Sequence, residues 1–469
     1  MRISLSPIDQ VIIVGYFLVV IAIGLLSTRR KPNALEFLLA GRTLTLPVFV
    51  MTLVSSWYGG ILGVGEFSYL YGFSNWIIQG FPYYFFAALF AFILAEKVRR
   101  TDLLTIPDKL EDAYGRKTAV LGSFLTFLLM VPAPYVLMLA VLLQLLTGWA
   151  LSTCLIVGTV ASTIYLFSGG FRSDVNTDIF EFFFMFLGFG LILPFAYFKF
   201  GGIEFIKSHV PPAHMTWNGG NSTQFVLIWF FIALWTFVDP TFHQRCYAAK
   251  SGRTARWGIL VSILFWFVFD AMTTFAGLYA RAALPNLTQP MMSYPLLAEQ
   301  TLPSVAKGFF YIGMLATIMS TFNTQAFVSA TTLGRDVFLR LRGDMGGNSV
   351  RATRWGLLIT GVGSMALAWY IPSVVRLWYT IGTVIVPGLL VPLVSSYFAR
   401  TRIPSSYAFV AMLSGWLVSL GWLLFGKGFP LEIEPMYPGL FVSLAVWAVG
   451  WLRLRSDERR SATSQCGGT

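Results

Sequence analysis

The chain has 469 residues, of which 56% are hydrophobic and only 12% are charged, and its mean hydropathy is +0.70. A soluble protein of this length would carry roughly twice that charged fraction, so the composition excludes an ordinary soluble protein and indicates an all-α integral membrane protein. The net charge of +12 does not indicate a nucleic-acid partner, because the basic residues follow a membrane pattern.

About 13 apolar stretches are predicted to be transmembrane helices, since a bilayer core needs about 20 mostly apolar residues per helix. The first is followed by STRRKP rather than by a small-residue cleavage site, so it is predicted to be a span and not a signal peptide. The stretches lie near residues 8–28, 45–71, 75–98, 118–147, 150–168, 175–198, 223–246, 256–280, 305–332, 353–372, 374–399, 405–425 and 434–452.

The basic residues fall on alternate loops when the N-terminus is placed outside. All but seven of the 33 Lys and Arg residues are then on the inner side; the seven are Arg2, Lys199, Lys207, Arg281, Lys307, Arg376 and Lys427. Inner loops of membrane proteins carry an excess of Lys and Arg. The pattern predicts a multi-pass membrane protein with an outer N-terminus and a cytoplasmic C-terminus. Because no cleavable signal peptide is evident and the loops are short, the plasma membrane is expected to be the inner membrane of a bacterium.

Two predicted spans are interrupted near their middles. The second contains SSWYGG, with Gly59 and Gly60, and the seventh contains WTFVDPTFHQR, with Asp239 and Pro240. Glycine weakens a helix, and proline removes an intrahelical hydrogen bond. The interruptions lie five spans apart, and paired broken helices in inverted repeats point to a transport site at the membrane midplane. Two ordinary kinks are the alternative.

This spacing predicts one transmembrane domain, 1–469, built around two inverted repeats of five helices. The first repeat is 45–199 and the second is 223–400. The remaining segments are an extra N-terminal helix at 8–28, two additional helices at 405–453 and a cytoplasmic tail at 454–469.

A polar stripe runs along the predicted span 305–332. Thr317, Ser320, Thr321 and Thr324 have the spacing i, i+3, i+4, i+7 and lie on one face of a helix, flanked by Asn323. Hydroxyl groups cannot face lipid without partners. Such residues also join transmembrane helices through hydrogen bonds, which is the structural alternative. A hard monovalent cation such as sodium prefers oxygen ligands, as calcium and magnesium do, so the stripe predicts a sodium site.

Five motifs, in order along the chain, resemble the sodium/solute symporter family, which includes sodium/proline and sodium/sugar symporters. The resemblance covers about residues 8–400, and the motifs are EFLLAGR at 36–42, TIPDKLEDAYGR, SGGFRSDVNTDIFE at 168–181, DPTFHQRCYAAK at 239–250, and MST followed by GRDVF. The resemblance implies the LeuT fold, a 5+5 inverted repeat whose first and sixth core helices are broken.

The resemblance also implies a sodium site between the first and eighth core helices. Its hydroxyl ligands would be Ser320 and Thr321, and its carbonyl ligands would be Thr317, Leu53 and Ser56. Many members of the family have a small residue where Thr317 stands.

Carboxylates inside predicted spans are costly and are functional candidates. Asp178 stands where the family pattern has TD, and together with Asn323 and Thr324 it is predicted to form a second cation or proton site; a structural anchor is the alternative. Glu66, Asp239 and Asp270 are candidates for coupling or for tuning the substrate, and Asp239 alternatively caps the half-helix after the break.

The solute is predicted to bind beside both breaks. The candidate residues are Ser55, Trp57, Tyr58, Gly59, Gln79, Trp235 and His243. This core carries several acids and no central base, which disfavours a dianionic solute.

These features predict a sodium-coupled symporter that imports a small polar organic solute by alternating access. A proton-coupled or uncoupled transporter of the same fold is one alternative, and a membrane sensor module is another. An enzyme is not expected, because no nucleophile with a base, phosphate loop or metal cluster appears. The expected partners are the solute, sodium and the lipid bilayer, with no nucleic acid and no obligate protein partner.

Overall fold

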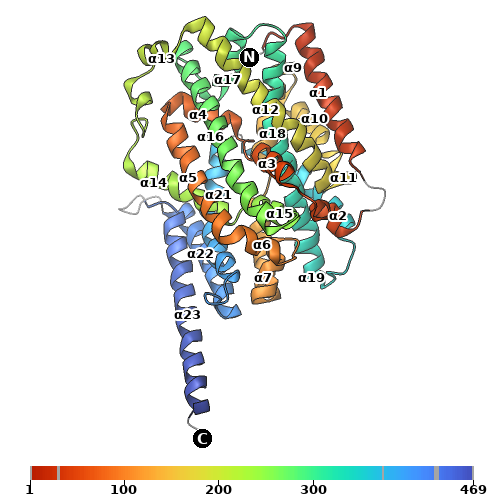
Figure 1. Ribbon diagram of the computed structural model, residues 1–469, viewed down its shortest axis with the longest axis vertical. Helices are drawn as coiled ribbons and strands as arrows, with labels where there is room; N and C mark the ends of the chain where they lie inside the picture. Colours follow the sequence, from red (N-terminus) through yellow and green to blue (C-terminus); the bar gives the residue numbers. More distant parts are fainter. Residues whose placement is uncertain (1–2, 29–31, 372–373, 427–432, 467–469) are drawn as a thin grey trace.

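A computed structural model describes residues 3–28, 32–371, 374–426 and 433–466 (Figure 1). All regular secondary structure in these ranges is helical, which confirms the predicted all-α class.

The first half of the chain contains the first broken helix and ends in a 30-residue helix, α12. The predicted span 118–147 is divided between α8 and α9, around Pro132, as its prolines predict. The elements of this half are α1 (Pro7–Leu26), α2 (Ala34–Leu39), η1 (Ala40–Arg42), α3 (Leu46–Ser55), α4 (Ile61–Tyr71), η2 (Trp76–Gly80), α5 (Phe81–Phe90), η3 (Ala91–Ala95), α6 (Glu96–Arg100), α7 (Ile106–Tyr114), α8 (Arg116–Leu129), α9 (Ala133–Thr147), α10 (Leu151–Thr163), α11 (Leu166–Gly169) and α12 (Phe171–Phe200).

The second half contains the second broken helix and the helix that carries the polar stripe, α18. Its elements are α13 (Ile203–His209), η4 (Pro212–Met215), α14 (Thr223–Ile232), η5 (Ala233–Phe237), α15 (Pro240–Ala248), α16 (Gly252–Ala283), η6 (Pro290–Met292), α17 (Ser293–Thr301), α18 (Ala306–Thr331), η7 (Thr332–Leu339), α19 (Arg340–Arg342), α20 (Ser349–Tyr370), α21 (Val374–Ser396), α22 (Ser405–Phe425) and α23 (Met436–Cys466).

Nine helices within the described ranges are long and apolar enough to cross a membrane. Two shorter apolar helices, Leu46–Ser55 and Thr380–Ser396, accompany them. Helix α18 is not among the nine, because its polar stripe lowers its hydropathy. The predicted number of 13 spans therefore stays a prediction.

Both predicted helix breaks are present. Residues 56–60 separate α3 from α4, and the glycine pair ends this gap. In the second break, Val238 and Asp239 follow η5, and α15 begins at Pro240. The carboxylate Oδ1 of Asp239 accepts a 2.7 Å hydrogen bond from the backbone N–H of Thr241, as a helix N-cap does.

The two broken helices are joined through the backbone at one end. The N–H of Leu44, before α3, bonds to the carbonyl of Ala248 at 3.1 Å, and the N–H of Lys250 bonds to the carbonyl of Leu44 at 2.9 Å. The start of α3 is therefore fixed against the end of α15.

Helix α18 is the centre of the bundle. Every residue from Phe310 to Thr331 is buried. Helix α12 packs along α18. The two backbones approach closely where Gly188 faces Gly313, because a Cβ on Gly313 would lie 2.9 Å from the Cα of Gly188.

The last three helices, α21 to α23, pack on one another beside this centre. In Figure 1, α22 and α23 occupy the lower part of the view, α23 extends beyond the rest of the chain, and the N-terminus lies near the opposite end.

Candidate functional site

The first break touches the polar stripe of α18 directly. The backbone N–H of Gly59 donates a 2.7 Å hydrogen bond to the hydroxyl of Thr321. A Cβ on Gly59 would lie 2.6 Å from that hydroxyl oxygen and 2.7 Å from Cδ1 of Tyr135, so the close approach requires glycine.

The break also exposes carbonyl groups at the end of α3. The N–H of Trp57 bonds to the carbonyl of Val54 at 3.3 Å, so the carbonyl of Leu53 loses the partner that a continued helix would supply. The hydroxyl of Ser56 donates a 2.6 Å hydrogen bond to the carbonyl of Thr52. The backbone carbonyl of Ser56 is therefore the group of this residue that is predicted to bind sodium.

The hydroxyls of the stripe have different partners. Thr317 donates to the carbonyl of Met314 at 2.7 Å, and Thr321 donates to the carbonyl of Thr317 at 3.3 Å. Ser320 donates to Oδ1 of Asp178 at 2.5 Å. The five residues predicted to bind sodium therefore come from two segments that meet at the Gly59–Thr321 hydrogen bond.

A buried charged cluster lies beside Ser320. Asp174, Asp178 and Glu181 lie on one face of α12 and are completely buried. The guanidinium of Arg245, from α15, lies 3.2 Å from Oδ2 of Asp178 and 3.9 Å from Oδ2 of Asp174. It also donates to the hydroxyl of Thr324 at 2.9 Å.

The three residues predicted to form a second cation or proton site are thus divided between different partners. Asp178 is bonded to Ser320 and Arg245, and Thr324 to Arg245 and Asp174. The side-chain amide of Asn323 instead donates to the hydroxyl of Tyr165.

Glu181 connects this cluster to the N-terminal helix. Its Oε1 accepts a 3.1 Å hydrogen bond from the hydroxyl of Tyr16, on α1. Its Oε2 is buried and has no hydrogen-bond partner in the described part of the chain. The sequence analysis did not assign a role to Glu181, although the spacing of Asp174, Asp178 and Glu181 predicts a shared helix face.

A cavity with a volume of about 160 Å³ lies between the two breaks. Ser56 and Thr321 line it, and so does Gly60. Among the residues predicted for the solute or for coupling, those that line it are Trp57, Tyr58, Gln79, Trp235, Asp239 and Asp270.

Four other predicted residues lie outside the lining of this cavity, within the part of the chain that the structure describes. Ser55 donates to the carbonyl of Met51 at 2.9 Å, and Gly59 packs on Thr321. His243 is fully buried, with Nε2 3.0 Å from the carbonyl of Phe237 and Nδ1 3.3 Å from the hydroxyl of Tyr397. Glu66 is only half-buried on α4.

The sequence analysis missed several side chains that line the cavity. Helical spacing carried the signal: Tyr83 lies one turn after Gln79, and Trp266 lies one turn before Asp270. The missed residues are Tyr83, Tyr84, Tyr135, Trp229, Trp266 and Gln325.

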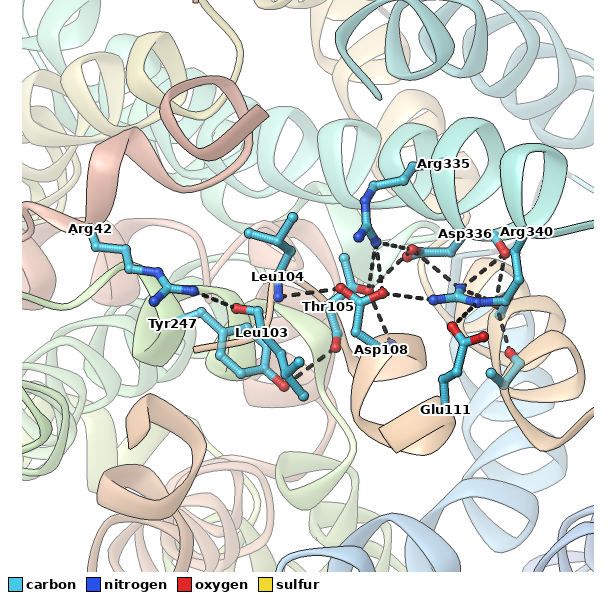
Figure 2. A network of polar contacts seen from close by, with 12 residues as sticks. Arg42, Leu103, Leu104, Thr105, Asp108, Glu111, Tyr247, Arg335, Asp336 and Arg340 are labelled. Carbon is cyan, nitrogen blue, oxygen red and sulfur yellow. Dashed lines mark hydrogen bonds and ion pairs between the residues drawn. The ribbon is translucent and has the colours of Figure 1, made fainter. Parts of the chain in front are cut away.

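An ionic network closes the fold at the end of α18 (Figure 2). Oδ1 of Asp108, in α7, lies 2.9 Å from Arg335 and 2.7 Å from Arg340. Arg340 also pairs with Glu111 at 2.9 Å, and the hydroxyl of Thr105 donates to Asp336 at 3.1 Å. The loop before α7 is thereby held against η7 and α19.

Comparison with known proteins matches this architecture to transporters. A solved structure of a sodium-coupled sialic acid symporter in a substrate-bound outward-open state superimposes with a TM-score of 0.79, at 17% identity, over 96% of this chain and 98% of the other. A transporter of the nucleobase–cation symport-1 family in a closed conformation gives a TM-score of 0.61, at 13% identity, over 91% and 96%. The fold is therefore that of the LeuT-like transporters, as predicted.

Relatives by sequence are also transporters. The sodium/pantothenate symporter of Escherichia coli K12 is 26% identical over 93% of this chain and 95% of its own length. The high-affinity choline transporter 1 of Drosophila melanogaster is 24% identical over 91% of this chain and 72% of its own length.

The family profile described as sodium:solute symporter family matches residues 37–415, which is most of the chain. The match confirms the predicted family and the prediction that the protein is a transporter rather than an enzyme. The chain belongs to the sodium:solute symporter family of multi-pass membrane transporters.

Proposed function

We propose that the protein is a sodium-coupled symporter that imports a small polar organic solute by alternating access. Sodium would be held by the hydroxyls of Ser320 and Thr321 and by the carbonyls of Leu53, Ser56 and Thr317. These are oxygen donors without net charge, a donor set suited to a hard monovalent cation.

The observation that carries this proposal is the shared position of Ser56 and Thr321. Both belong to the proposed sodium ligands, and both line the cavity between the breaks. A cation that fixes these two residues therefore shapes the wall on which the solute binds. This arrangement gives a physical basis for positive coupling between ion and solute, in which each raises the affinity of the other.

The ionic network at the end of α18 supports a state closed on its cytoplasmic side. The predicted inner loops are rich in basic residues, including Arg335 and Arg340, and this supports a cytoplasmic position for the network. We propose the corresponding topology, with the N-terminus outside, the C-terminus inside, and the protein in the inner membrane of a bacterium.

Proton coupling is the second candidate, because the cluster beside Ser320 has more carboxylates than cations. Asp174 and Asp178 share the guanidinium of Arg245, whereas Glu181, on the same face of α12, is bonded to the neutral hydroxyl of Tyr16. Buried carboxylates without a positive partner are costly in the ionised form. A proton on this cluster, or a second cation at Asp178, Asn323 and Thr324, would relieve that cost.

Uptake into proteoliposomes separates the two candidates. Vesicles containing the protein would receive an inward gradient of sodium, of potassium or of protons, with radiolabelled pantothenate, choline and lactate offered in turn. The proposal expects uptake driven by the sodium gradient and abolished by a sodium ionophore. Uptake driven by the proton gradient, and unchanged when sodium is replaced by potassium, would favour the second candidate.

A further inference from the structure

The wall of the cavity is built mainly from aromatic rings. Trp57 lies at its centre: its ring centroid is 5.4 Å from that of Trp266 and 5.2 Å from that of Tyr83. Tyr84 and Trp235 also line the cavity. The faces of aromatic rings carry negative potential and attract a cation that lies within about 6 Å of the ring centroid.

Two carboxylates also line the cavity. Asp270 accepts a hydrogen bond from the hydroxyl of Tyr84, and both groups approach the backbone at Gly80. A Cβ on Gly80 would lie 2.8 Å from Oδ2 of Asp270 and 2.8 Å from the hydroxyl of Tyr84, so the chain needs glycine there. Asp239 is the second carboxylate.

No Lys, Arg or His residue from the described ranges lines this cavity. Asp239 and Asp270 are the two acidic side chains that line it, and their ionisation would give the wall a formal charge of −2. One sodium ion at the adjacent site would leave that charge only half compensated. An anionic solute would meet repulsion from the remaining charge, whereas a cationic solute would complete the compensation.

The size of the cavity limits the solute. Its volume of about 160 Å³ is well below the roughly 300–1,000 Å³ of sites for drug-sized ligands. A solute that fits has few heavy atoms.

We infer that the solute is a small organic monocation whose ammonium group is held by the rings of Trp57, Trp266 and Tyr83 and neutralised by Asp270. This inference rests on the proposed symport function, because it assumes that the cavity is the transport site. It differs from a carboxylate solute such as pantothenate, which one relative is named for, and agrees in charge with choline, which another is named for.

Binding to the purified full-length protein tests the inference. Choline, tetramethylammonium and ethanolamine would be titrated in sodium and in potassium at equal ionic strength. The same titrations would be made with 3,3-dimethyl-1-butanol, the uncharged carbon analogue of choline, and with pantothenate. Tryptophan fluorescence is a direct measure, because Trp57, Trp235 and Trp266 line the cavity.

The inference predicts that at least one ammonium compound binds in sodium and that choline binds at least about tenfold more tightly than its uncharged analogue. It predicts that Asp270→Asn weakens choline binding at least about tenfold. Glu204→Gln, which changes an exposed carboxylate in α13, would leave it unchanged. Trp57→Phe keeps a ring at the centre of the wall and provides a second variant should Asp270→Asn not fold; it would weaken choline binding, because Phe is a poorer cation–π partner than Trp.

Three results would overturn the inference. They are equal binding of choline and its uncharged analogue, binding of pantothenate without binding of choline, and failure of all three ammonium compounds to bind a protein that still responds to sodium. The last result would leave sodium coupling intact. Conversely, ammonium binding that is the same in sodium and potassium would support the cationic cavity and count against sodium coupling, so the two failures are distinguishable.

Discussion

The N–H of Gly59 is hydrogen-bonded to the hydroxyl of Thr321, so the break in the first core helix is attached to the polar stripe of α18 at a single point. This bond brings the residues that follow α3 against the hydroxyl of Thr321, which itself donates to the carbonyl of Thr317 in its own helix. Thr321 and Ser56, both proposed sodium ligands, also line the cavity.

Gly59→Ala is expected to abolish this attachment. The added Cβ would lie within 2.7 Å of both Thr321 and Tyr135, so α3 and α18 must separate. Sodium affinity should fall more than about tenfold, since two of the proposed ligand groups move apart. The measurement is the sodium concentration that gives half-maximal thermal stabilisation.

Gly363→Ala in α20 is the matched control, because a Cβ there has no neighbour within 4 Å. It should leave sodium affinity unchanged and slightly stabilise the helix, by up to ~1 kcal/mol. Equal sodium affinity in the Gly59 variant and the wild type would contradict the role given to this contact.

Both helix breaks followed from the sequence because their causes are local. Gly59, Gly60 and Pro240 alter the backbone where they stand, whatever packs around them. The stripe from Thr317 to Thr324 was equally visible, since its spacing is that of one helix face.

The side chains that form the wall of the cavity could not be predicted from the sequence in the same way. Trp266 and Tyr83 lie on helices far apart in the sequence, and only tertiary packing brings their rings to Trp57. His243 shows the converse: it lies one turn after the second break, but the carbonyl of Phe237 and the hydroxyl of Tyr397 hold its ring away from the cavity. The pairing of Arg245 with Asp178 likewise depends on how α15 meets α12.

Arg245→Gln is expected to destabilise the protein strongly. The side chain is fully buried and is the partner of two carboxylates. Removing one partner of a buried ion pair typically costs ~3–5 kcal/mol, because the remaining charge is left uncompensated. Unfolding in mixed micelles titrated with sodium dodecyl sulfate would measure the difference.

The double variant Arg245→Gln/Asp178→Asn tests the cause of that loss. Because it removes a negative charge together with the positive one, it should recover part of the stability lost in the single variant. A double variant less stable than Arg245→Gln alone would show that the charge pair is not what the arginine supplies.

Asp108→Asn is expected to loosen the ionic network at the end of α18, because Asp108 accepts from both Arg335 and Arg340. Cys246 is a native reporter, since it is fully buried in α15, one residue before Tyr247, whose hydroxyl contacts the loop before α7. In a background with Cys154 and Cys466 replaced by serine, the maleimide labelling rate of Cys246 should rise several-fold.

Asp112→Asn in the same helix is the control, because the Asp112 side chain is 53% exposed and its partner, Lys109, is not part of the network with Arg335 and Arg340. It should not change the labelling rate. Equal labelling rates of Cys246 in the Asp108 variant and the parent would show that the network does not limit access to Cys246.

His214 predicts an acid-sensitive loop between α13 and α14. Burial lowers the pKa of its imidazole, and its Nε2–H donates to the carbonyl of Tyr69 at 3.0 Å. Since the folded-state pKa lies below the unfolded value of about 6.5, the unfolded chain takes up protons first as pH falls. The stability is fully present above about pH 6.5 and is lost as pH falls from there toward the folded-state pKa.

Thermal denaturation across this pH range would measure the effect. His214→Gln should flatten the dependence, whereas the exposed His209→Gln should retain it. A slope that is the same in wild type and His214→Gln would assign the acid sensitivity to another group.

The central claim is that sodium binds where the first break meets α18. The most direct measurement is thermal stability of the purified protein during titration with NaCl against KCl at fixed ionic strength, for the wild type and for Ser320→Ala/Thr321→Ala. The account predicts a saturable, sodium-specific rise in melting temperature that is lost in the double variant. A wild type that responds equally to sodium and potassium, or a double variant that keeps the sodium response, would contradict it.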